Sequence, residues 1–454
     1  MPDNTKLDAL LSDAARRGID YRQAALERSV APTPEAVAAV EKFIEPMPQT
    51  GTADAEVLAM LDDIGTPATV NMVGPRYFGF VIGGSLPVTV ATNWLSAAWD
   101  QNVGMHEVTP ATSTLELVSM AWMKELFGLP ENAAAAFVTG ATVANFSALA
   151  AARNRVYNDV GWNVEADGLI GAPPVTIIIS EESHPTVYKS LGLLGFGRNR
   201  VVRAPVDAAG RIDIKKFPDV SGPTIVCTQA GNVNTGAFDP VGEICELVKP
   251  HGAWVHVDGA FGLWAAASPD RAHLCSGFAA ADSWATDAHK WLNVPYDSGV
   301  AFVRDVGALK SAMAITAEYL PTETEFRNPS DFTPELSRRA RGVDVWAALK
   351  SLGRDGVAEM IDRCCSNARR FAERLQAEGF EVLNDVVLNQ VLVAFGDEAE
   401  TQRVIAGIQE DGTCWCGITI WQGRTAMRIS VCNWSTTPED VDRSVEAILR
   451  VARQ

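Results

Sequence analysis

The chain has 454 residues, of which 47% are hydrophobic and 21% are charged, an ordinary globular composition that excludes global disorder. With 38 basic and 56 acidic side chains the formal net charge is −18, so the chain lacks the cationic field that nucleic-acid binding needs. No apolar run reaches the roughly 18 residues of a membrane helix, and the acidic first residues do not resemble a secretory signal. We therefore expect a cytoplasmic protein that binds neither nucleic acid nor membrane.

The predicted elements change character twice along the chain. Residues 5–62 are expected to be mostly helical with proline breaks, and apolar spacing predicts a helix over 112–127. From about residue 134, short Val/Ile-rich runs alternate with helical stretches, which is typical of strands buried on both faces of a mostly parallel sheet. The seven runs are 134–138, 175–179, 201–204, 224–228, 254–257, 283–286 and 300–303.

The last hundred residues predict a small α+β domain. A helix is expected over 357–378, strands over 388–395, 417–421 and 427–431, and a final helix from about residue 438 with Thr436 or Thr437 as its N-cap. Eight cysteines lie scattered without the spacing of a disulfide framework, which favours reduced thiols. Cys414 and Cys416 lack a second pair or a nearby histidine, so we expect no metal site.

A lysine follows the strand predicted over 283–286, in the segment DAHKW at 287–291. Lysine at the carboxyl end of a buried strand is unusual, because an unpaired buried ammonium group is costly. Lys290 is therefore a candidate Schiff-base amine, whose pKa must be lowered for it to act as a nucleophile. The alternative is a surface lysine whose stem lies along apolar neighbours.

Asp258 ends the run at 254–257, and small residues follow it. Combined with a Schiff-base lysine, a carboxylate in that place suggests pyridoxal phosphate, whose pyridinium nitrogen it would keep protonated. Ala260 would then give the cofactor ring a flat apolar neighbour. The alternative for Asp258 is a helix cap or a turn.

Two further strand ends carry polar groups. The junction 139–145 lies between a predicted strand and a helix of small residues, and such a junction points N–H groups at an anion such as the cofactor phosphate. His184 follows the run at 175–179 and could stack on the cofactor ring. Their alternatives are an ordinary helix N-cap and a surface-loop histidine. Four such positions at the same edge of one α/β pattern are more specific than any one alone.

With these residues in place, the chain resembles the group II pyridoxal-phosphate-dependent amino acid decarboxylases, which include aromatic-L-amino-acid and glutamate decarboxylases. The resemblance runs from the segment PRYF at 75–78 to MRIS at 427–430 and includes the family's H-K-W signature at 289–291. It implies a fold type I architecture with a seven-stranded, mostly parallel sheet and a small C-terminal domain. It also implies Lys290 as the Schiff-base lysine, Asp258 on the pyridinium nitrogen and His184 on the ring.

The resemblance assigns further contacts and bears on the reaction. It implies that the cofactor phosphate is bound by Ala141, Thr142, Asp287 and His289, and it places a polar contact near Asn232. Tyr319 stands in the Tyr-Leu pair of the family's catalytic loop, where the hydroxyl protonates the carbon that has lost carbon dioxide. Tyr319 therefore favours decarboxylation, with the alternative that it only packs the loop.

We expect a carboxy-lyase that converts an L-amino acid, favouring an aromatic or bulky apolar side chain, to its amine. The alternatives are an aldehyde synthase, an aldehyde lyase or an aminotransferase on the same fold, and more remotely a non-catalytic binding protein. Departures from the family pattern at 80–84, Val143 and Gly259 bear on the substrate more than on the cofactor. The expected division is a helical dimerisation segment over 1–85, a cofactor-binding domain over 86–345 and a small domain over 346–454, in a homodimer.

Overall fold

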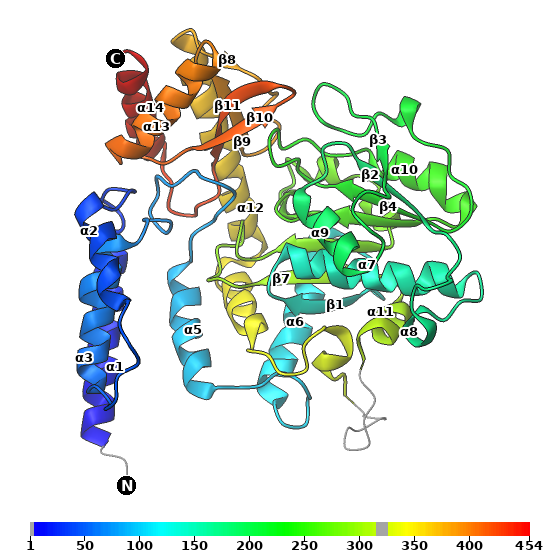
Figure 1. Ribbon diagram of the computed structural model, residues 1–454, viewed down its shortest axis with the longest axis horizontal. Helices are drawn as coiled ribbons and strands as arrows, with labels where there is room; N and C mark the ends of the chain where they lie inside the picture. Colours follow the sequence, from blue (N-terminus) through cyan, green and yellow to red (C-terminus); the bar gives the residue numbers. More distant parts are fainter. Residues whose placement is uncertain (1–3, 315–325) are drawn as a thin grey trace.

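The structure is a computed structural model that describes residues 4–314 and 326–454. In these residues the chain forms a seven-stranded and a four-stranded sheet, with helices packed around both (Figure 1). A column of N-terminal helices stands beside the body of the molecule, and the small sheet packs against the long helix α12 (Arg341–Ala377). Within the described part, no helix is long and apolar enough to cross a bilayer.

The large sheet has the strand order β1-β7-β6-β5-β4-β2-β3. All neighbouring strands pair in parallel except β7, which is antiparallel to both β1 and β6. Consequently β1 points the same way as the parallel strands, and their carboxyl ends share one edge of the sheet. The strands are β1 (Ala134–Val138), β2 (Thr176–Ser180), β3 (Val202–Ala204), β4 (Thr224–Gln229), β5 (Trp254–Asp258), β6 (Ser283–Asp287) and β7 (Gly299–Val303).

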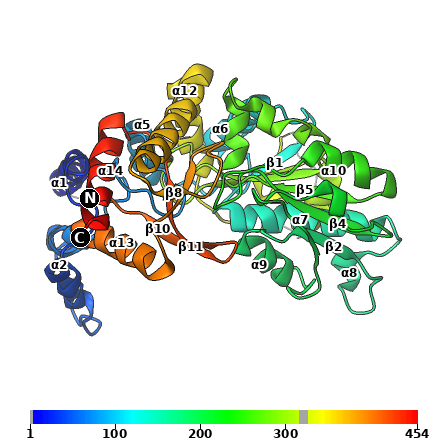
Figure 2. The ribbon, with the colours of Figure 1, turned by 90° about the horizontal axis from the view of Figure 1, so that it is seen from above.

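Helices cover both faces of this sheet, so its central strands are buried throughout (Figure 2). Ile177 and Ile179 of β2 pack into the cluster that contains α7, α9 and α11, whereas Ile178 between them packs into the cluster on the opposite face. This alternation is the two-residue period of a strand, and burial on both faces explains the continuous apolar runs. The helices of this region are α7 (Ala141–Asn158), α8 (Val164–Asp167), α9 (Pro185–Leu193), α10 (Val241–Val248) and α11 (Val306–Met313).

Residues 4–127 form helices without a sheet of their own. Proline residues begin several of them, because proline at the first helical position lacks only an N–H that would be unpaired anyway. Side chains of α1, α3 and α5 line a cavity of about 320 Å³ on this side of the molecule. The helices are α1 (Asn4–Ala24), α2 (Pro34–Ala39), α3 (Asp54–Met60), α4 (Thr66–Ala68), α5 (Pro87–Trp99) and α6 (Pro110–Phe127).

The C-terminal part is an antiparallel sheet covered by helices. Its strand order is β10-β11-β9-β8, and α12 and α14 pack together beside it. Thr437 caps α14 by accepting the Asp440 N–H, while the Asp440 carboxylate accepts the Thr437 N–H. The elements are β8 (Glu381–Val382), β9 (Gln390–Ala394), α13 (Glu398–Asp411), β10 (Gly417–Trp421), β11 (Arg424–Ser430) and α14 (Pro438–Ala452).

The predicted sheet is confirmed: each of the seven apolar runs is a strand, with ends that shift by a residue or so. The predicted helix 357–378 is one half of α12, which begins at Arg341 and is interrupted at Gly353, where φ is 63°. Buried polar residues such as Asp344 obscure the apolar pattern of the first half. The division of the chain into three domains stays a prediction.

Candidate active site

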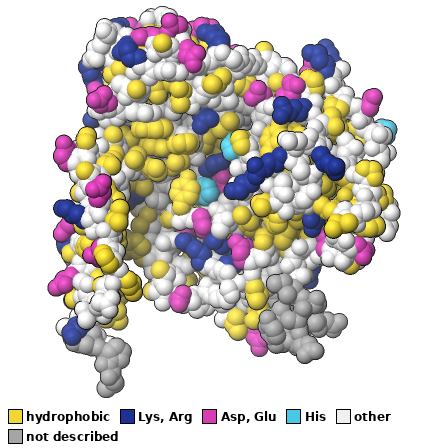
Figure 3. Space-filling model, in the orientation of Figure 1, with side chains coloured by type: hydrophobic (Ala, Val, Ile, Leu, Met, Phe, Trp, Pro, Cys, Tyr) yellow, Lys and Arg dark blue, Asp and Glu magenta, His cyan; other side chains and the backbone are white. Residues whose placement is uncertain are grey.

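A cavity of about 340 Å³ opens at the edge of the large sheet where β5 and β6 end and α7 begins. Figure 3 shows this face of the molecule, where basic and histidine side chains meet around a hollow beside a broad apolar area. Eight of the ten residues expected at the site line this one cavity. They are Ala141, Thr142, His184, Asp258, Ala260, Asp287, His289 and Lys290.

Lys290 lies in the turn that leads from β6 toward β7. The Ser298 carbonyl accepts the N–H groups of both Ala288 and His289, at 3.0 and 3.2 Å, and so closes this turn. The Lys290 ammonium group lies 3.1 Å from Asp287 Oδ2. Behind it the chain is closely packed, because a Cβ on Gly83 would lie 1.8 Å from the Lys290 carbonyl oxygen. The lysine is therefore held by its backbone while its amine faces the cavity.

Asp287 connects the end of β6 to the start of α7. Its Oδ1 accepts the Ala141 N–H at 2.6 Å and lies 3.5 Å from His289 Nε2. A carboxylate at a helix N-terminus is stabilised by the unpaired N–H groups and the helix dipole. Gly140 permits this approach, because a Cβ there would already lie 3.0 Å from the His289 ring. The N-terminus of α7 thus holds the Asp287 carboxylate at the edge of the cavity.

Asp258 ends β5, the strand beside β6, and also lines the cavity. Its Oδ2 accepts Asn145 Nδ2 at 3.0 Å, and its Oδ1 accepts the Ala260 N–H at 3.2 Å. The side chain is buried, yet each oxygen has a donor. Both oxygens are thereby fixed in place, and the carboxylate forms part of the cavity wall.

The two histidines of the cavity are neutral at pH 7, because burial lowers the pKa of His184 and of His289. His184 is the N-cap of α9, where its Nδ1 accepts the Thr186 N–H at 3.3 Å. The proton of the neutral ring is therefore on Nε2. His289 Nδ1 accepts the Ser298 N–H at 3.0 Å, and the Tyr296 ring stacks on the imidazole at 4.3 Å between centroids.

The residues present fit pyridoxal phosphate. The cavity offers an amine for an aldehyde, a carboxylate for a ring nitrogen, a flat imidazole and a helix N-terminus for a phosphate. Gln229 supplies an independent sign, because it lines the cavity and its Nε2 is buried without a hydrogen-bond partner. Such an unpaired donor is costly unless a bound group accepts from it. Elsewhere in the described residues, no group of three or more His, Cys, Asp or Glu side chains could hold a metal.

Asn232 is not among the described residues that line the cavity. Asn232 closes its own loop, where its Oδ1 accepts the N–H groups of Asn234 at 2.8 Å and Thr235 at 3.2 Å. Its Nδ2 is buried without a partner. Tyr319 lies outside the described residues.

Arg428 is a charged residue near His184 to which sequence reasoning gave no role, and it is not among the described residues that line the cavity. It lies on β11 of the small sheet, close enough to His184 that its charge helps to lower the pKa of that histidine. Burial lowers the pKa of Arg428 itself, and its Nε is buried without a hydrogen-bond partner. The sequence signal for Arg428 is an arginine among the apolar residues of a predicted strand. Such a position is unusual, because an arginine that is buried there normally needs a partner.

With this geometry established, comparisons with known proteins agree on one family. A family model described as "Pyridoxal-dependent decarboxylase conserved domain" matches residues 47–396. The aromatic-L-amino-acid decarboxylase of Bacillus atrophaeus is 26% identical over 96% of this chain and 93% of its own length. The L-2,4-diaminobutyrate decarboxylase of Rhizobium meliloti (strain 1021) is 27% identical over 90% of this chain and 84% of its own.

Solved structures show the same fold. An Oryza sativa TDC structure with PLP and tryptamine has a TM-score of 0.91 at 20% identity, covering 100% of this chain and 99% of its own. Mouse CSAD has a TM-score of 0.90 at 22% identity, covering 99% of both chains. These likenesses confirm the expected fold type I architecture.

Proposed function

The chain belongs to the family of pyridoxal-dependent decarboxylases, and we propose that it uses the cavity around Lys290 to decarboxylate an L-amino acid with an aromatic or bulky apolar side chain. Membership of this family makes the chain an amino acid decarboxylase whose cofactor is pyridoxal 5'-phosphate. The observation that carries the proposed site is the meeting of Lys290, Asp258, His184 and the α7 N-terminus around one cavity.

Each of these groups has a proposed role in holding the cofactor. Lys290 binds the aldehyde carbon through its amine, and the Asp258 carboxylate pairs with the ring nitrogen. The Ala141 and Thr142 end of the cavity, with Asp287 and His289, holds the phosphate. When bound, pyridoxal phosphate supplies an electron sink for the charge released at the substrate α-carbon.

The chain's own residues then decide which bond is broken. Arg428 is a half-buried cation near His184 whose Nε has no hydrogen-bond partner, so we assign it to the substrate carboxylate. An arginine that binds and orients the substrate carboxylate would favour loss of carbon dioxide by positioning. His184 carries its proton on Nε2 and is a candidate donor of that proton to the α-carbon, as is Tyr319.

The substrate preference is supported by the cavity wall, to which Phe261, Val233 and Ala260 contribute apolar surface. The relatives named above act, by their names, on aromatic amino acids and on L-2,4-diaminobutyrate, so a substrate panel has to include both classes. Acidic amino acids belong in the same panel, because an acidic amino acid decarboxylase of Mus musculus is 28% identical over 74% of this chain.

A product assay tests this function. Purified holoenzyme is incubated with aromatic, aliphatic, acidic and diamino acids, and the products are identified by mass spectrometry. We expect amine and carbon dioxide from an aromatic or bulky apolar amino acid, and no product from the Lys290→Ala variant. An aldehyde with ammonia in place of the amine would assign the protein to aldehyde synthase chemistry. Normal turnover by Lys290→Ala would disprove the site.

We also propose that the protein acts as a cytoplasmic homodimer. Its eight cysteines are all buried and free, which supports a reducing compartment. Apolar side chains stay exposed on the N-terminal helices and on α5, where a second copy could cover them. The largest of them are Leu7, Leu11, Ile44, Met47, Val57, Leu61, Trp94, Leu95 and Trp99.

A further inference from the structure

A chain of buried hydrogen bonds leads away from Asp258 into the core of the large domain. Asp258 Oδ2 accepts Asn145 Nδ2 at 3.0 Å, and Asn145 Oδ1 lies 2.9 Å from His256 Nε2. The other ring nitrogen, His256 Nδ1, lies 2.9 Å from Ser283 Oγ, which in turn lies 2.9 Å from Trp254 Nε1. All five residues are buried, and the chain crosses from β6 through β5 to α7.

Every bond in this chain has a fixed direction. An ionised carboxylate only accepts, so the Asn145 amide must turn its NH₂ group to Asp258 and its oxygen to His256. His256 Nε2 must then carry the proton, and because burial lowers the pKa of His256 to about 3, the ring is neutral and Nδ1 accepts. Ser283 therefore donates to Nδ1 and accepts from Trp254. The indole N–H can only donate, so the far end of the chain imposes the same direction.

We propose that Asn145, His256, Ser283 and Trp254 form a one-way hydrogen-bond relay that positions the Asp258 carboxylate toward the cofactor's ring nitrogen. Hydrogen bonds that all point one way polarise one another, and a bond to a charged acceptor is worth more than a neutral one. Asn145 and His256 are thus positioning residues that act through Asp258. This inference rests on the proposed pairing of Asp258 with the ring nitrogen.

Other titratable groups face Asp258 and stay unchanged in the test. His184 and Cys227 both feel the Asp258 charge, and Lys290 and Arg428 face His184 from the other side of the cavity. None of these side chains donates to Asp258 among the described residues, where its two donors are Asn145 and Ala260. Loss of the Asn145 donor therefore removes half of the hydrogen bonds that hold the carboxylate.

The test follows the protonation of the cofactor's ring nitrogen directly. Holoenzyme is reconstituted with pyridoxal phosphate labelled with ¹⁵N in the ring, and the nitrogen shift is recorded by NMR over a pH series. In Asn145→Leu, which removes the donor at similar volume, we expect deprotonation to move about one to two pKa units lower. His256→Leu should shift it in the same direction. His256→Gln, whose amide can still donate to Asn145, should restore most of the parental value.

A matched control separates the relay from general loss of a buried hydrogen bond. Thr228 Oγ1 donates to the backbone carbonyl of His256 at 3.0 Å but is not part of the relay, so Thr228→Val should leave the ring nitrogen unchanged. An unchanged nitrogen in Asn145→Leu, or an equal shift in Thr228→Val, would overturn the relay. If Asn145→Leu does not fold, Ser283→Ala interrupts the same chain at its far end. It should shift the pKa of the ring nitrogen in the same direction by a smaller amount. The absence of a shift in Ser283→Ala would then disprove the relay.

The reference variant Asp258→Asn distinguishes failure of the relay from failure of the proposed pairing between Asp258 and the ring nitrogen. If the ring nitrogen of Asp258→Asn stays protonated as in the parent, the proposed role of Asp258 is wrong, and the relay is disproved as well. If Asp258→Asn deprotonates the nitrogen while Asn145→Leu does not, Asp258 keeps its role and the relay alone is disproved.

Discussion

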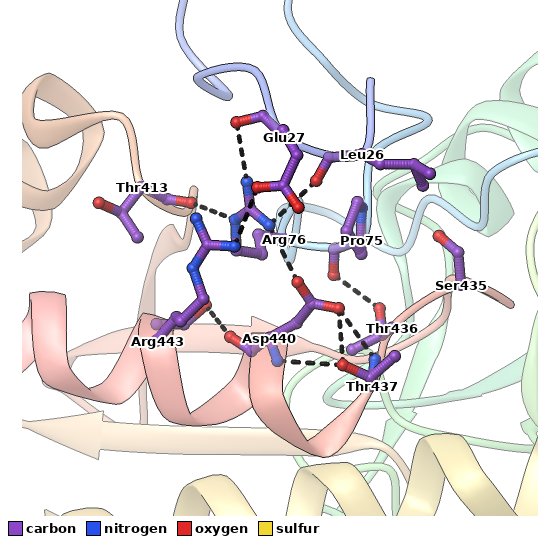
Figure 4. A network of polar contacts seen from close by, with 12 residues as sticks. Leu26, Glu27, Pro75, Arg76, Thr413, Ser435, Thr436, Thr437, Asp440 and Arg443 are labelled. Carbon is purple, nitrogen blue, oxygen red and sulfur yellow. Dashed lines mark hydrogen bonds and ion pairs between the residues drawn. The ribbon is translucent and has the colours of Figure 1, made fainter. Parts of the chain in front are cut away.

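Arg76 joins the N-terminal segment to the C-terminal part of the chain, and its removal should loosen that connection without unfolding the large sheet. The guanidinium is buried, with 3% of its side chain exposed, and lies 2.9 Å from Asp440 Oδ1 (Figure 4). It also donates to the carbonyl groups of Leu26, Glu27 and Thr413 at 3.2, 3.4 and 3.0 Å. One side chain therefore holds three separated segments together.

The expected cost of Arg76→Met follows from these contacts. Breaking a buried ion pair costs about 3–5 kcal/mol, because the remaining charge loses its partner. Asp440 still accepts the N–H and the hydroxyl of Thr437, at 3.1 and 3.0 Å, so the lower end of that range applies. Methionine replaces the apolar stem, which limits the loss of packing. A cost of about 3 kcal/mol raises an opening equilibrium by more than a hundredfold.

Hydrogen exchange measures this opening where it occurs. The Val30 N–H donates to the Gly412 carbonyl at 2.8 Å and so reports whether the N-terminal segment lies on the small domain. Peptides that contain Val30 should exchange about a hundredfold faster in Arg76→Met. Arg443→Met is the matched control, because Arg443 pairs with Glu27 at the exposed surface and such pairs contribute little. Equal exchange rates in the two variants would refute the reasoning.

Three further predictions concern the cofactor lysine, pH and assembly. Gly83→Ala should weaken cofactor binding, measured by visible absorbance, because its Cβ would collide with the Lys290 carbonyl, whereas Gly51→Ala, with nothing within 4 Å, should bind as the parent does. Burial lowers the pKa of His256 to about 3, so as the pH falls this histidine is protonated in the unfolded chain before it is protonated in the folded one. The free energy of unfolding should therefore fall as the pH drops below about 6.5. Urea unfolding of His256→Gln should show a smaller loss over that range, and an equal loss would contradict the assignment. The double variant Ile44→Glu/Leu95→Glu should sediment as a monomer. Ile170 is also an exposed apolar residue but lies elsewhere, so Ile170→Glu should sediment as the parent does. A parent protein that sediments as a monomer would exclude the dimer.

The fold was predictable from sequence where burial alone determined which residues form an element. The strands of the large sheet are buried on both faces, so each left a continuous apolar run that marked it clearly. Strand direction left no such mark, and the antiparallel placement of β7 emerges only from the structure. The first half of α12 was missed because Arg341 and Asp344 are buried there as charged partners of other segments, which breaks the apolar period.

The cofactor side of the site was visible because its chemistry stands at strand ends. Asp258 follows an apolar run directly, and Lys290 and His184 follow theirs within a few residues; the shared edge of a parallel sheet brings such positions together. The relay left no comparable signal. Asn145 and His256 are 111 residues apart, and an asparagine in a helix or a histidine in a strand gives no indication of its partner until both are buried side by side.

The proposed substrate side was less predictable, because the residues assigned to it come from other elements than the large sheet. Gly83 packs on Lys290 from the segment before α5, and Arg428 reaches the cavity region from β11, so neither is placed by the α/β pattern. Gly259 departs from the family pattern, and the structure explains why. A Cβ at this position would lie 2.7 Å from Leu263 Cβ, so the local packing leaves no room for a larger residue. The cofactor end is fixed by sheet geometry, whereas the substrate end is assembled from segments that can vary without disturbing it. Substitutions at Arg428 should therefore change the Michaelis constant while cofactor affinity stays near that of the parent, whereas substitutions at Asp258 should change the cofactor first.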